Sequence, residues 1–157
     1  MSEKFGYRGY IGSRPVRGTS YPHRVQNLVI RDYANRRKLP YKLSATEYAM
    51  SGCYMMLADV VTELPSLDGI ILFSLFMLPQ RPQRRREIYD RVLTEKCQLH
   101  AALEAMVLAD KNDIEHFEET IEVAFTLPHA PMRSYYPKTG KIDEKDSFWK
   151  ALNQTID

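Results

Sequence analysis

The sequence lacks a large excess of charge of either sign. It contains 22 basic and 20 acidic side chains among 157 residues, so the formal net charge is only +2. Proteins dedicated to nucleic acids usually carry a strong basic excess, because contacts to phosphates supply much of their affinity. The near balance of charge therefore argues against a nucleic-acid partner.

Cysteine is scarce, and a long hydrophobic run is absent. Cys53 and Cys97 have no metal-binding or redox spacing, so we expect free thiols in a reducing cytoplasm. The longest uncharged apolar stretch, Gly69–Pro79, is too short to span a bilayer. The N-terminus Met1–Lys4 is polar and shows no signal peptide. These features predict a cytoplasmic protein without a membrane span.

Strand and helix patterns alternate along the chain. We expect strands at Tyr7–Ser13, Lys42–Tyr48, Asp68–Ser74 and Gln98–Glu104. We expect helices at His23–Lys38, Cys53–Leu64, Pro82–Lys96 and Asn112–Phe125. In the first helix, Val25, Leu28, Val29 and Tyr33 have the spacing of an inner face. Such alternation indicates a parallel α/β sheet, with Asp68–Ser74 as a central strand because it is continuously apolar.

The predicted fold is a three-layer α/β domain over residues 1–127, with a mostly parallel four-stranded sheet of order 2-1-3-4. Ligands of such sheets bind at the carboxyl ends of the strands, where the strand order reverses. That point lies between the first and third strands. Residues 128–157 contain Pro128, Pro131, Pro137 and Gly140, and we expect a Pro-rich tail with a short helix at Ser147–Asn153.

The loop after the first strand combines cations with hydroxyl groups. Ser13, Arg14 and Arg17 precede a helix whose free N–H groups could complete an anion site. The alternative is a solvated basic loop. The glycine spacing matches neither a Walker loop nor the dinucleotide fingerprint, so we predict no cofactor.

The second and fourth strands carry further candidates. Glu47 and Tyr48 could form an acid–base pair or orient a polar ligand, whereas the alternative for Glu47 is a capping or ion-pairing role. His100 and Glu104 lie four residues apart and would share one face of a regular strand. His100 is a candidate catalyst, although a histidine in an apolar run is more often a satisfied interior residue. No cluster has the converging ligands of a metal site.

Two segments around the third strand are unusual. The strand is followed by the apolar loop Ser74–Pro79, which could pack on a partner, cover a ligand or belong to the core. Partner packing predicts a homo-oligomer through Leu75–Pro79. The basic run Arg81, Arg84, Arg85 and Arg86 opens the next helix, where cations are mildly unfavourable, so either a counter-anion or a solvated face would explain it.

Four segments resemble a family of small bacterial proteins called sporadic carbohydrate cluster proteins. They are Gly9–Ile11 with Ser13–Pro15, Val25–Tyr33, Ser44–Met50 and Ser74–Pro79. The family is placed with gene clusters for surface polysaccharides and unusual sugars, so the resemblance implies a pathway rather than a reaction. Within these segments we add Gln26, Asn27, Ser44 and Ser74 to the candidate ligand-binding residues, and Glu104 joins them from the fourth strand.

The order of elements also resembles the catalytic domain of serine recombinases (resolvases). That domain has a nucleophilic serine after its first strand, and Ser13 would stand near that place, offset by one residue. The aspartate and two arginines that follow the family's central strand are replaced here by Phe76, Met77 and Gln80. Phosphoryl transfer needs such charges to stabilise its transition state. The resemblance therefore implies a resolvase or flavodoxin-like scaffold without recombinase chemistry.

Two functions follow from these patterns. The first is an enzyme or ligand-handling protein that binds a sugar or sugar-nucleotide in surface-carbohydrate biosynthesis. Ser13, Arg14 and Arg17 would hold a phosphate or sugar carboxylate, with Ser74 opposite. Glu47 would be the general base, assisted by Tyr48 or His100. The second is a non-catalytic protein that assembles or regulates enzymes of the same pathway.

Overall fold

The computed structural model describes residues 3–48 and 52–127, and the predictions for Ala49, Met50 and the tail from Pro128 onward lie outside them. The strands are β1 (Tyr7–Gly12), β2 (Tyr41–Glu47), β3 (Gly69–Leu72), β4 (Gln98–Ala101) and β5 (Met106–Leu108). The helices are α1 (His23–Arg36), α2 (Met55–Glu63), α3 (Pro82–Thr94) and α4 (Lys111–Thr126), with short 3₁₀ turns η1 (Leu64–Ser66) and η2 (Leu75–Met77).

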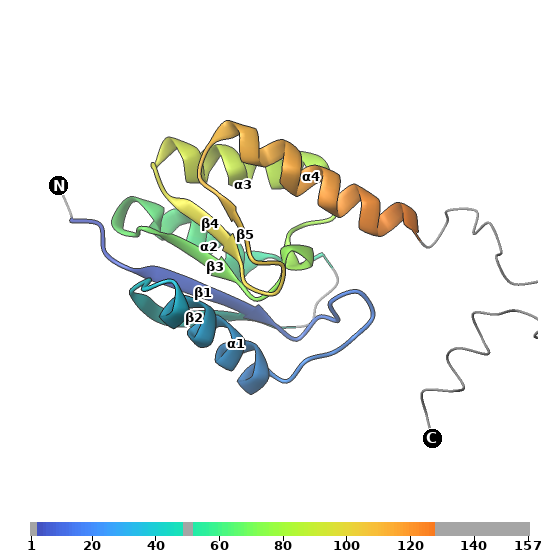
Figure 1. Cartoon of the computed structure of the whole chain (residues 1–157), viewed down its shortest axis with the longest axis horizontal. Coiled ribbons are helices and arrows are strands. Elements are labelled where there is room, and N and C mark those ends of the chain that lie inside the picture. The colour runs from blue at the N-terminus through green and yellow to red at the C-terminus, as the bar shows by residue number, and fades with distance from the viewer. Residues whose placement is uncertain (1–2, 49–51, 128–157) are drawn as a thin grey trace, which may run out of the picture. The chain divides into compact units, whose positions relative to one another are not determined.

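The strands form one sheet of order β2-β1-β3-β4-β5. β1 to β4 run parallel, which confirms the expected α/β class and the order 2-1-3-4. Because parallel connections are right-handed, α1 covers one face of the sheet, and α2 and α3 cover the other. Figure 1 shows α1 and α2 on opposite sides of the strands. This arrangement brings the loops after β1, β2 and β3 together at one edge.

The predicted fourth strand is wrong in its second half. β4 ends at Ala101, the chain turns back through Ala102–Ala105, and β5 pairs with β4 in the antiparallel direction. Ala105 has φ +52°, a left-handed conformation that sequence patterns associate with glycine or asparagine. The turn therefore had no sequence signal. As a result Glu104 lies in the turn, and it does not share a strand face with His100.

The inner face of α1 is rotated from the predicted one. Its buried residues are Gln26, Ile30, Tyr33 and Ala34, whereas Leu28 is 60% exposed. Gln26 explains the rotation, because its side chain accepts from Gly12 N (3.0 Å) and donates to Gly12 O (2.7 Å). A polar side chain that binds the end of β1 thus determines which side of the helix faces the sheet.

The apolar segment after β3 belongs to the core of the chain. Leu75 is fully buried in η2, and Met77 and Leu78 are nearly so. Ser74 opens the turn by accepting a hydrogen bond from Phe76 N at 3.2 Å. Since the chain itself covers most of this segment, the reason for expecting an oligomer through Leu75–Pro79 is removed.

Helices α3 and α4 are joined by a partly buried ion pair. Arg85 donates from Nε and Nη2 to the two carboxylate oxygens of Glu118, at 2.8 and 2.7 Å, and Tyr89 donates to the same carboxylate at 2.7 Å. The hydrogen bond from Arg85 lowers the pKa of the Glu118 carboxyl. Nη1 of Arg85 also donates to the carbonyl groups of Pro79 and Gln80. One arginine therefore holds α3, α4 and the preceding loop together.

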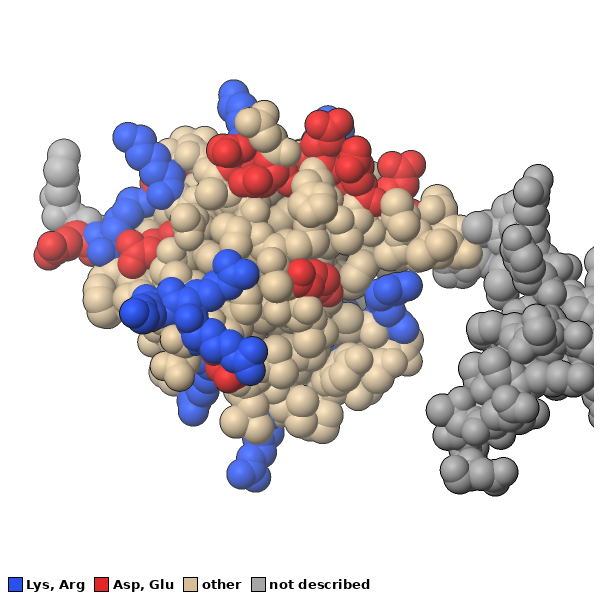
Figure 2. Space-filling view, in the orientation of Figure 1, with Lys and Arg blue, Asp and Glu red and all other residues tan. Residues whose placement is uncertain are grey.

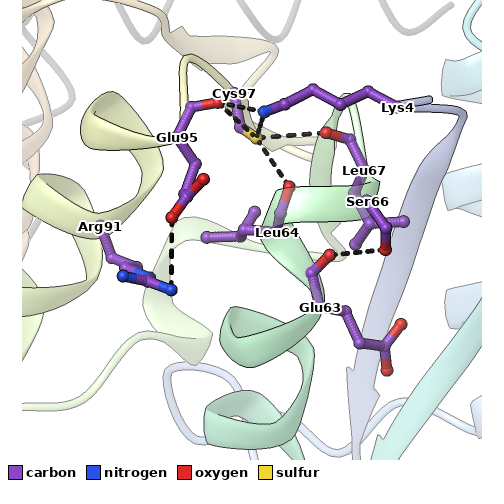
Figure 3. A network of polar contacts seen from close by, with 8 residues as sticks. All are labelled: Lys4, Glu63, Leu64, Ser66, Leu67, Arg91, Glu95 and Cys97. Carbon is purple, nitrogen blue, oxygen red and sulfur yellow. Dashed lines mark hydrogen bonds and ion pairs between the residues drawn. The ribbon is translucent and has the colours of Figure 1, made fainter. Parts of the chain in front are cut away.

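The amino end of the sheet contains a closed polar network (Figure 3). Cys97 lies before β4 and is 2% exposed, and its thiol contacts the carbonyl oxygens of Leu67 (3.2 Å) and Leu64 (3.4 Å). Lys4 donates to the carbonyl oxygen of Glu95 and to the Cys97 sulfur. Burial raises the pKa of the Cys97 thiol. These polar groups at the amino end of the sheet therefore find their hydrogen-bond partners within the chain.

Charge is unevenly distributed on the surface. Figure 2 shows acidic side chains gathered over α4 and basic side chains over the carboxyl-terminal half of α1. In the described part of the chain, no helix has the length and apolar character needed to cross a bilayer.

Candidate functional site

A groove lies at the carboxyl end of the sheet, where three loops meet. It consists of two adjoining hollows of about 410 and 510 Å³ that share Gly52, Tyr54, Pro79 and Arg84 as lining residues. Gly52 and Tyr54 belong to the connection from β2 to α2, and Pro79 and Arg84 to the connection from β3 into α3. The volumes fall in the range of small-molecule sites, which are about 300–1,000 Å³.

The smaller hollow is strongly cationic. Arg14, Arg81 and Arg84 line it together with Gln80. Among the described residues, none of these three arginines forms an ion pair with a carboxylate. Guanidinium groups that converge without counter-charges bind phosphate or carboxylate well, because their planar forks match these anions. We name this part the cationic hollow.

The larger hollow is mainly apolar. Besides the shared residues, its walls are formed by Met55, Leu57, Ala58 and Val61 of α2, Glu87 and Ile88 of α3, and Cys53. Met55 is 70% exposed, which is unusual for a large apolar side chain at the start of a helix. We name this part the apolar hollow. Glu87 contributes one carboxylate to its wall.

Arg14 is held in place before any ligand arrives. Its guanidinium carbon lies 3.9 Å from the centre of the Tyr54 ring, a stacking distance. Nη2 donates to the Tyr10 hydroxyl (3.1 Å), and Nη1 donates to the carbonyl oxygen of Cys53 (3.2 Å). An arginine has five N–H donors, so donors remain for an anion.

Glu47 is linked to Arg14 through the Tyr10 hydroxyl. It is 2% exposed, and its Oε2 accepts from the Tyr10 hydroxyl (3.1 Å) and from the backbone N–H groups of Met56 (2.9 Å) and Leu57 (3.2 Å). Burial raises the pKa of Tyr10, so its hydroxyl stays protonated, donates to Glu47 and accepts from Arg14. Glu47 therefore caps α2 and positions Arg14, in agreement with the capping alternative; its role as a general base stays a prediction.

Ser13 and Tyr48 lie apart from the arginines. The Ser13 hydroxyl is 3.0 Å from Nε2 of His23 at the start of α1, and the Tyr48 ring meets the His23 ring edge-on with centroids 6.1 Å apart. Arg17 stacks near Phe76, 5.1 Å from its ring centre. Neither Ser13 nor Arg17 lines the groove, so the loop after β1 contributes Arg14 alone.

The candidates near α1 have structural partners. Gln26 is fully buried and holds the end of β1, as described above. The Tyr41 hydroxyl contacts the Ser44 hydroxyl (2.7 Å) and reaches Asn27 Oδ1 at 3.4 Å. None of these residues lines either hollow, and their proposed contact with a ligand stays a prediction.

Ser74 and Glu104 are brought together, although they are thirty residues apart in sequence. The Ser74 hydroxyl donates to Glu104 Oε1 (2.7 Å), and Leu75 N donates to Oε2 (2.8 Å). The carboxylate of the β4–β5 turn therefore caps η2. We expected Ser74 to face Ser13, but the two side chains have different partners. Ser74 bonds to Glu104, whereas Ser13 contacts His23 and Glu47.

His100 is an interior residue. It is 3% exposed, its Nδ1 lies 2.8 Å from the Tyr33 hydroxyl, and its Nε2 lies 3.0 Å from Gln98 Oε1. These contacts place it on the face covered by α1, away from the groove. Burial lowers the pKa of His100 to about 4, with a smaller contribution from Arg37. A neutral imidazole with both nitrogens engaged fits the satisfied interior histidine.

Three lining residues, Tyr54, Arg81 and Arg84, were not among the ligand-binding candidates from the sequence, although a counter-anion was one of the two explanations for the basic run that contains both arginines. The signal for the two arginines was present, because basic residues at the first turn of a helix need an explanation. The sequence did not show which arginines of the basic run would face the groove. In the structure Arg85 packs inward against Glu118, whereas Arg81 and Arg84 line the groove. For Tyr54 no local signal exists, since an aromatic residue before a helix is equally typical of the core.

No family model matches the sequence, and no curated protein matches it either. Among solved structures, the chain is similar to the N-terminal catalytic domain of TP901-1 integrase, with a TM-score of 0.51 and 14% identity, over 76% of this chain and 98% of that chain. The scaffold is therefore similar to that of a serine recombinase catalytic domain. At this identity the similarity shows the fold alone.

Proposed function

We propose that the protein binds an anionic sugar, either a phosphorylated sugar or a sugar-nucleotide, in the groove at the carboxyl end of the sheet. The observation that carries the proposal is the cationic hollow. Arg14, Arg81 and Arg84 line it together, and among the described residues none of them forms an ion pair with a carboxylate. An anion that accepts charge-assisted hydrogen bonds from several arginines would fill this place.

The proposed pathway is bacterial surface-carbohydrate biosynthesis. Support comes from the resemblance to sporadic carbohydrate cluster proteins, two of whose segments supply groove residues. Ser13–Pro15 contains Arg14, and Ser74–Pro79 ends at Pro79, which lines both hollows. The proposal concerns binding, because Glu87 is the one carboxylate among the described lining residues and no described histidine lines the groove.

DNA strand exchange is not proposed, although the scaffold is recombinase-like. Phe76 and Met77, which stand where recombinases carry charges, belong to η2, and Met77 is 6% exposed. The face drawn in Figure 2 also carries acidic side chains over α4, rather than a uniformly positive surface. Both observations support the expectation that nucleic acid is not the partner.

Calorimetric titration with inorganic pyrophosphate and with sugar 1-phosphates tests the proposal. We expect saturable binding by the unaltered protein and a loss of about tenfold or more in Arg84→Met, because a charge-assisted hydrogen bond contributes roughly 1.5–3 kcal/mol. Arg86→Met is the matched control, since Arg86 is exposed on the same helix and does not line the groove. Absence of binding, or equal losses in the two variants, would refute the proposal.

A second candidate function is a non-catalytic contact with pathway enzymes or with another copy of the chain. It is favoured by exposed apolar side chains outside the groove, since Leu28 is 60%, Leu43 72% and Tyr48 71% exposed. Light scattering of the full chain, alone and with pathway enzymes, tests it. The candidate predicts a mass above the monomer that falls when Leu28 and Leu43 are both changed to lysine.

A further inference from the structure

The two hollows of the groove differ in chemistry but lie next to each other. Arg84 and Tyr54 line both, so a ligand seated on the arginines is within reach of the apolar hollow. A phosphate or a phosphorylated sugar alone would leave the apolar walls of Met55, Val61 and Ile88 in contact with water. The shape and chemistry of the groove therefore suit a larger ligand with an anionic end and a flat or apolar end.

We propose that this ligand is a nucleoside diphosphate, free or as the carrier part of a sugar-nucleotide, with its phosphates in the cationic hollow and its nucleoside in the apolar hollow. This inference rests on the proposed function, because it needs the arginines to bind the anion. Inorganic phosphate would occupy only the first hollow. The nucleoside would contribute apolar contact and stacking against side chains such as Tyr54.

Glu87 distinguishes a nucleoside from a hydrocarbon chain. Glu87 is an exposed residue of α3 that lines the apolar hollow, and an alkyl or isoprenoid chain there would offer its carboxylate no hydrogen-bond donor. A nucleoside offers hydroxyl and amino donors that a carboxylate can accept. The volume of about 510 Å³ is also a compact space, whereas a long lipid chain would extend beyond it.

Ala58 provides a direct means of closing the apolar hollow. It is exposed on α2 and lines that hollow but not the cationic one. Ala58→Trp would fill the space while leaving the buried residues Leu57 and Val60 in place. Thr62→Trp is the matched control, because Thr62 is exposed on the same helix and lies outside both linings.

The experiment measures affinities of the full chain for pyrophosphate, UDP, GDP, ADP and farnesyl diphosphate. We expect at least one nucleoside diphosphate to bind about tenfold or more tightly than pyrophosphate. Ala58→Trp should abolish that advantage and leave the pyrophosphate affinity unchanged, whereas Arg84→Met should weaken both. Thr62→Trp should behave as the unaltered protein.

The outcomes separate this inference from the proposed function. If pyrophosphate binds through Arg84 and no nucleoside diphosphate binds more tightly, the nucleoside is refuted and the anion site stands. If farnesyl diphosphate alone gains affinity, and loses it in Ala58→Trp, the occupant is a lipid phosphate and the inference is overturned. If none of the probes binds, both proposals fail.

Discussion

The two ends of the sheet use similar polar groups in opposite ways. At the amino end, Lys4 and Cys97 contact main-chain carbonyl oxygens of neighbouring segments, and the network is closed within the chain (Figure 3). At the carboxyl end, Arg81 and Arg84 are exposed, and no described carboxylate pairs with them. The carboxyl end also has contacts that are closed within the chain, such as Ser74 with Glu104, but it differs from the amino end in these exposed arginines without an ion-pair partner among the described residues.

The same contrast exists inside a single run of sequence. Arg84 and Arg85 are neighbours, yet Arg85 is 5% exposed and bonded to Glu118, whereas Arg84 faces the groove. Arg84 lines the cationic hollow with Arg14 and Arg81, and like charges that lie close together repel one another. The proposed anionic ligand would offset this repulsion.

The largest expected effect on stability comes from Arg85, whose side chain is bonded within the chain like the polar groups at the amino end. Arg85→Ala would leave the partly buried Glu118 carboxylate with Tyr89 as a donor and would remove the donor to the Pro79 and Gln80 carbonyl groups, so the free energy of unfolding should fall by about 3 kcal/mol. Urea unfolding measures it. Arg86→Ala, one residue on and exposed, should change the value by no more than about 0.5 kcal/mol. Equal losses in both would contradict the structure.

A smaller effect concerns His100, which lies between the two ends in the core. Burial lowers its pKa to about 4. When the pH falls, His100 is therefore protonated in the unfolded chain while it is still neutral in the folded chain. Stability should then fall by about 2 kcal/mol between about pH 7 and about pH 5. Glu118 adds nothing in this window, because its pKa is lowered and its contribution is lost only in stronger acid.

The measurement is urea unfolding of the unaltered protein and of His100→Gln at both pH values. The variant has no titrating side chain at this position, so it should lose less stability on acidification. An identical pH dependence in the two proteins would show that His100 is not buried as a neutral group.

The smallest effect on stability compares Lys4 at the amino end of the sheet with Arg84 at the carboxyl end. Lys4→Met removes donors to Glu95 O and the Cys97 sulfur, and should lower the free energy of unfolding by about 1 kcal/mol. Arg84→Met should leave it within about 0.5 kcal/mol, because no ion pair links its guanidinium to a described residue. Thermal unfolding of both variants measures the two changes in stability. A larger loss in Arg84→Met would mean that the groove arginines stabilise the fold.

Much of the architecture was predictable from the sequence, because it depends on local patterns. The continuous apolar run of β3 and the proline at the start of α3 indicated buried strand and helix boundaries correctly. The turn at Ala105 was missed because its left-handed backbone has no local signature. The inner face of α1 was missed because a buried glutamine, Gln26, replaces the expected apolar residues.

Less of the candidate site was predictable. The carboxyl end of the sheet followed from the alternation of strands and helices, and Arg14 was singled out there. The roles of Glu47 and His100 depend on contacts with distant residues, which a single sequence does not show. Glu47 meets Tyr10 of β1 and the start of α2, and His100 meets Tyr33 of α1.

The sequence by itself determined the α/β class, the order 2-1-3-4 and the edge of the sheet where polar loops gather. The class and the edge follow from periodicity and from general rules for parallel sheets, whereas the order was expected from the resemblance to the resolvase or flavodoxin-like class. Only the tertiary structure decided which arginines of one run are paired and which line a groove. Whether a charge has a partner depends on residues far away in sequence, and packing brings Glu118 to Arg85 while leaving Arg84 without a carboxylate among the described residues.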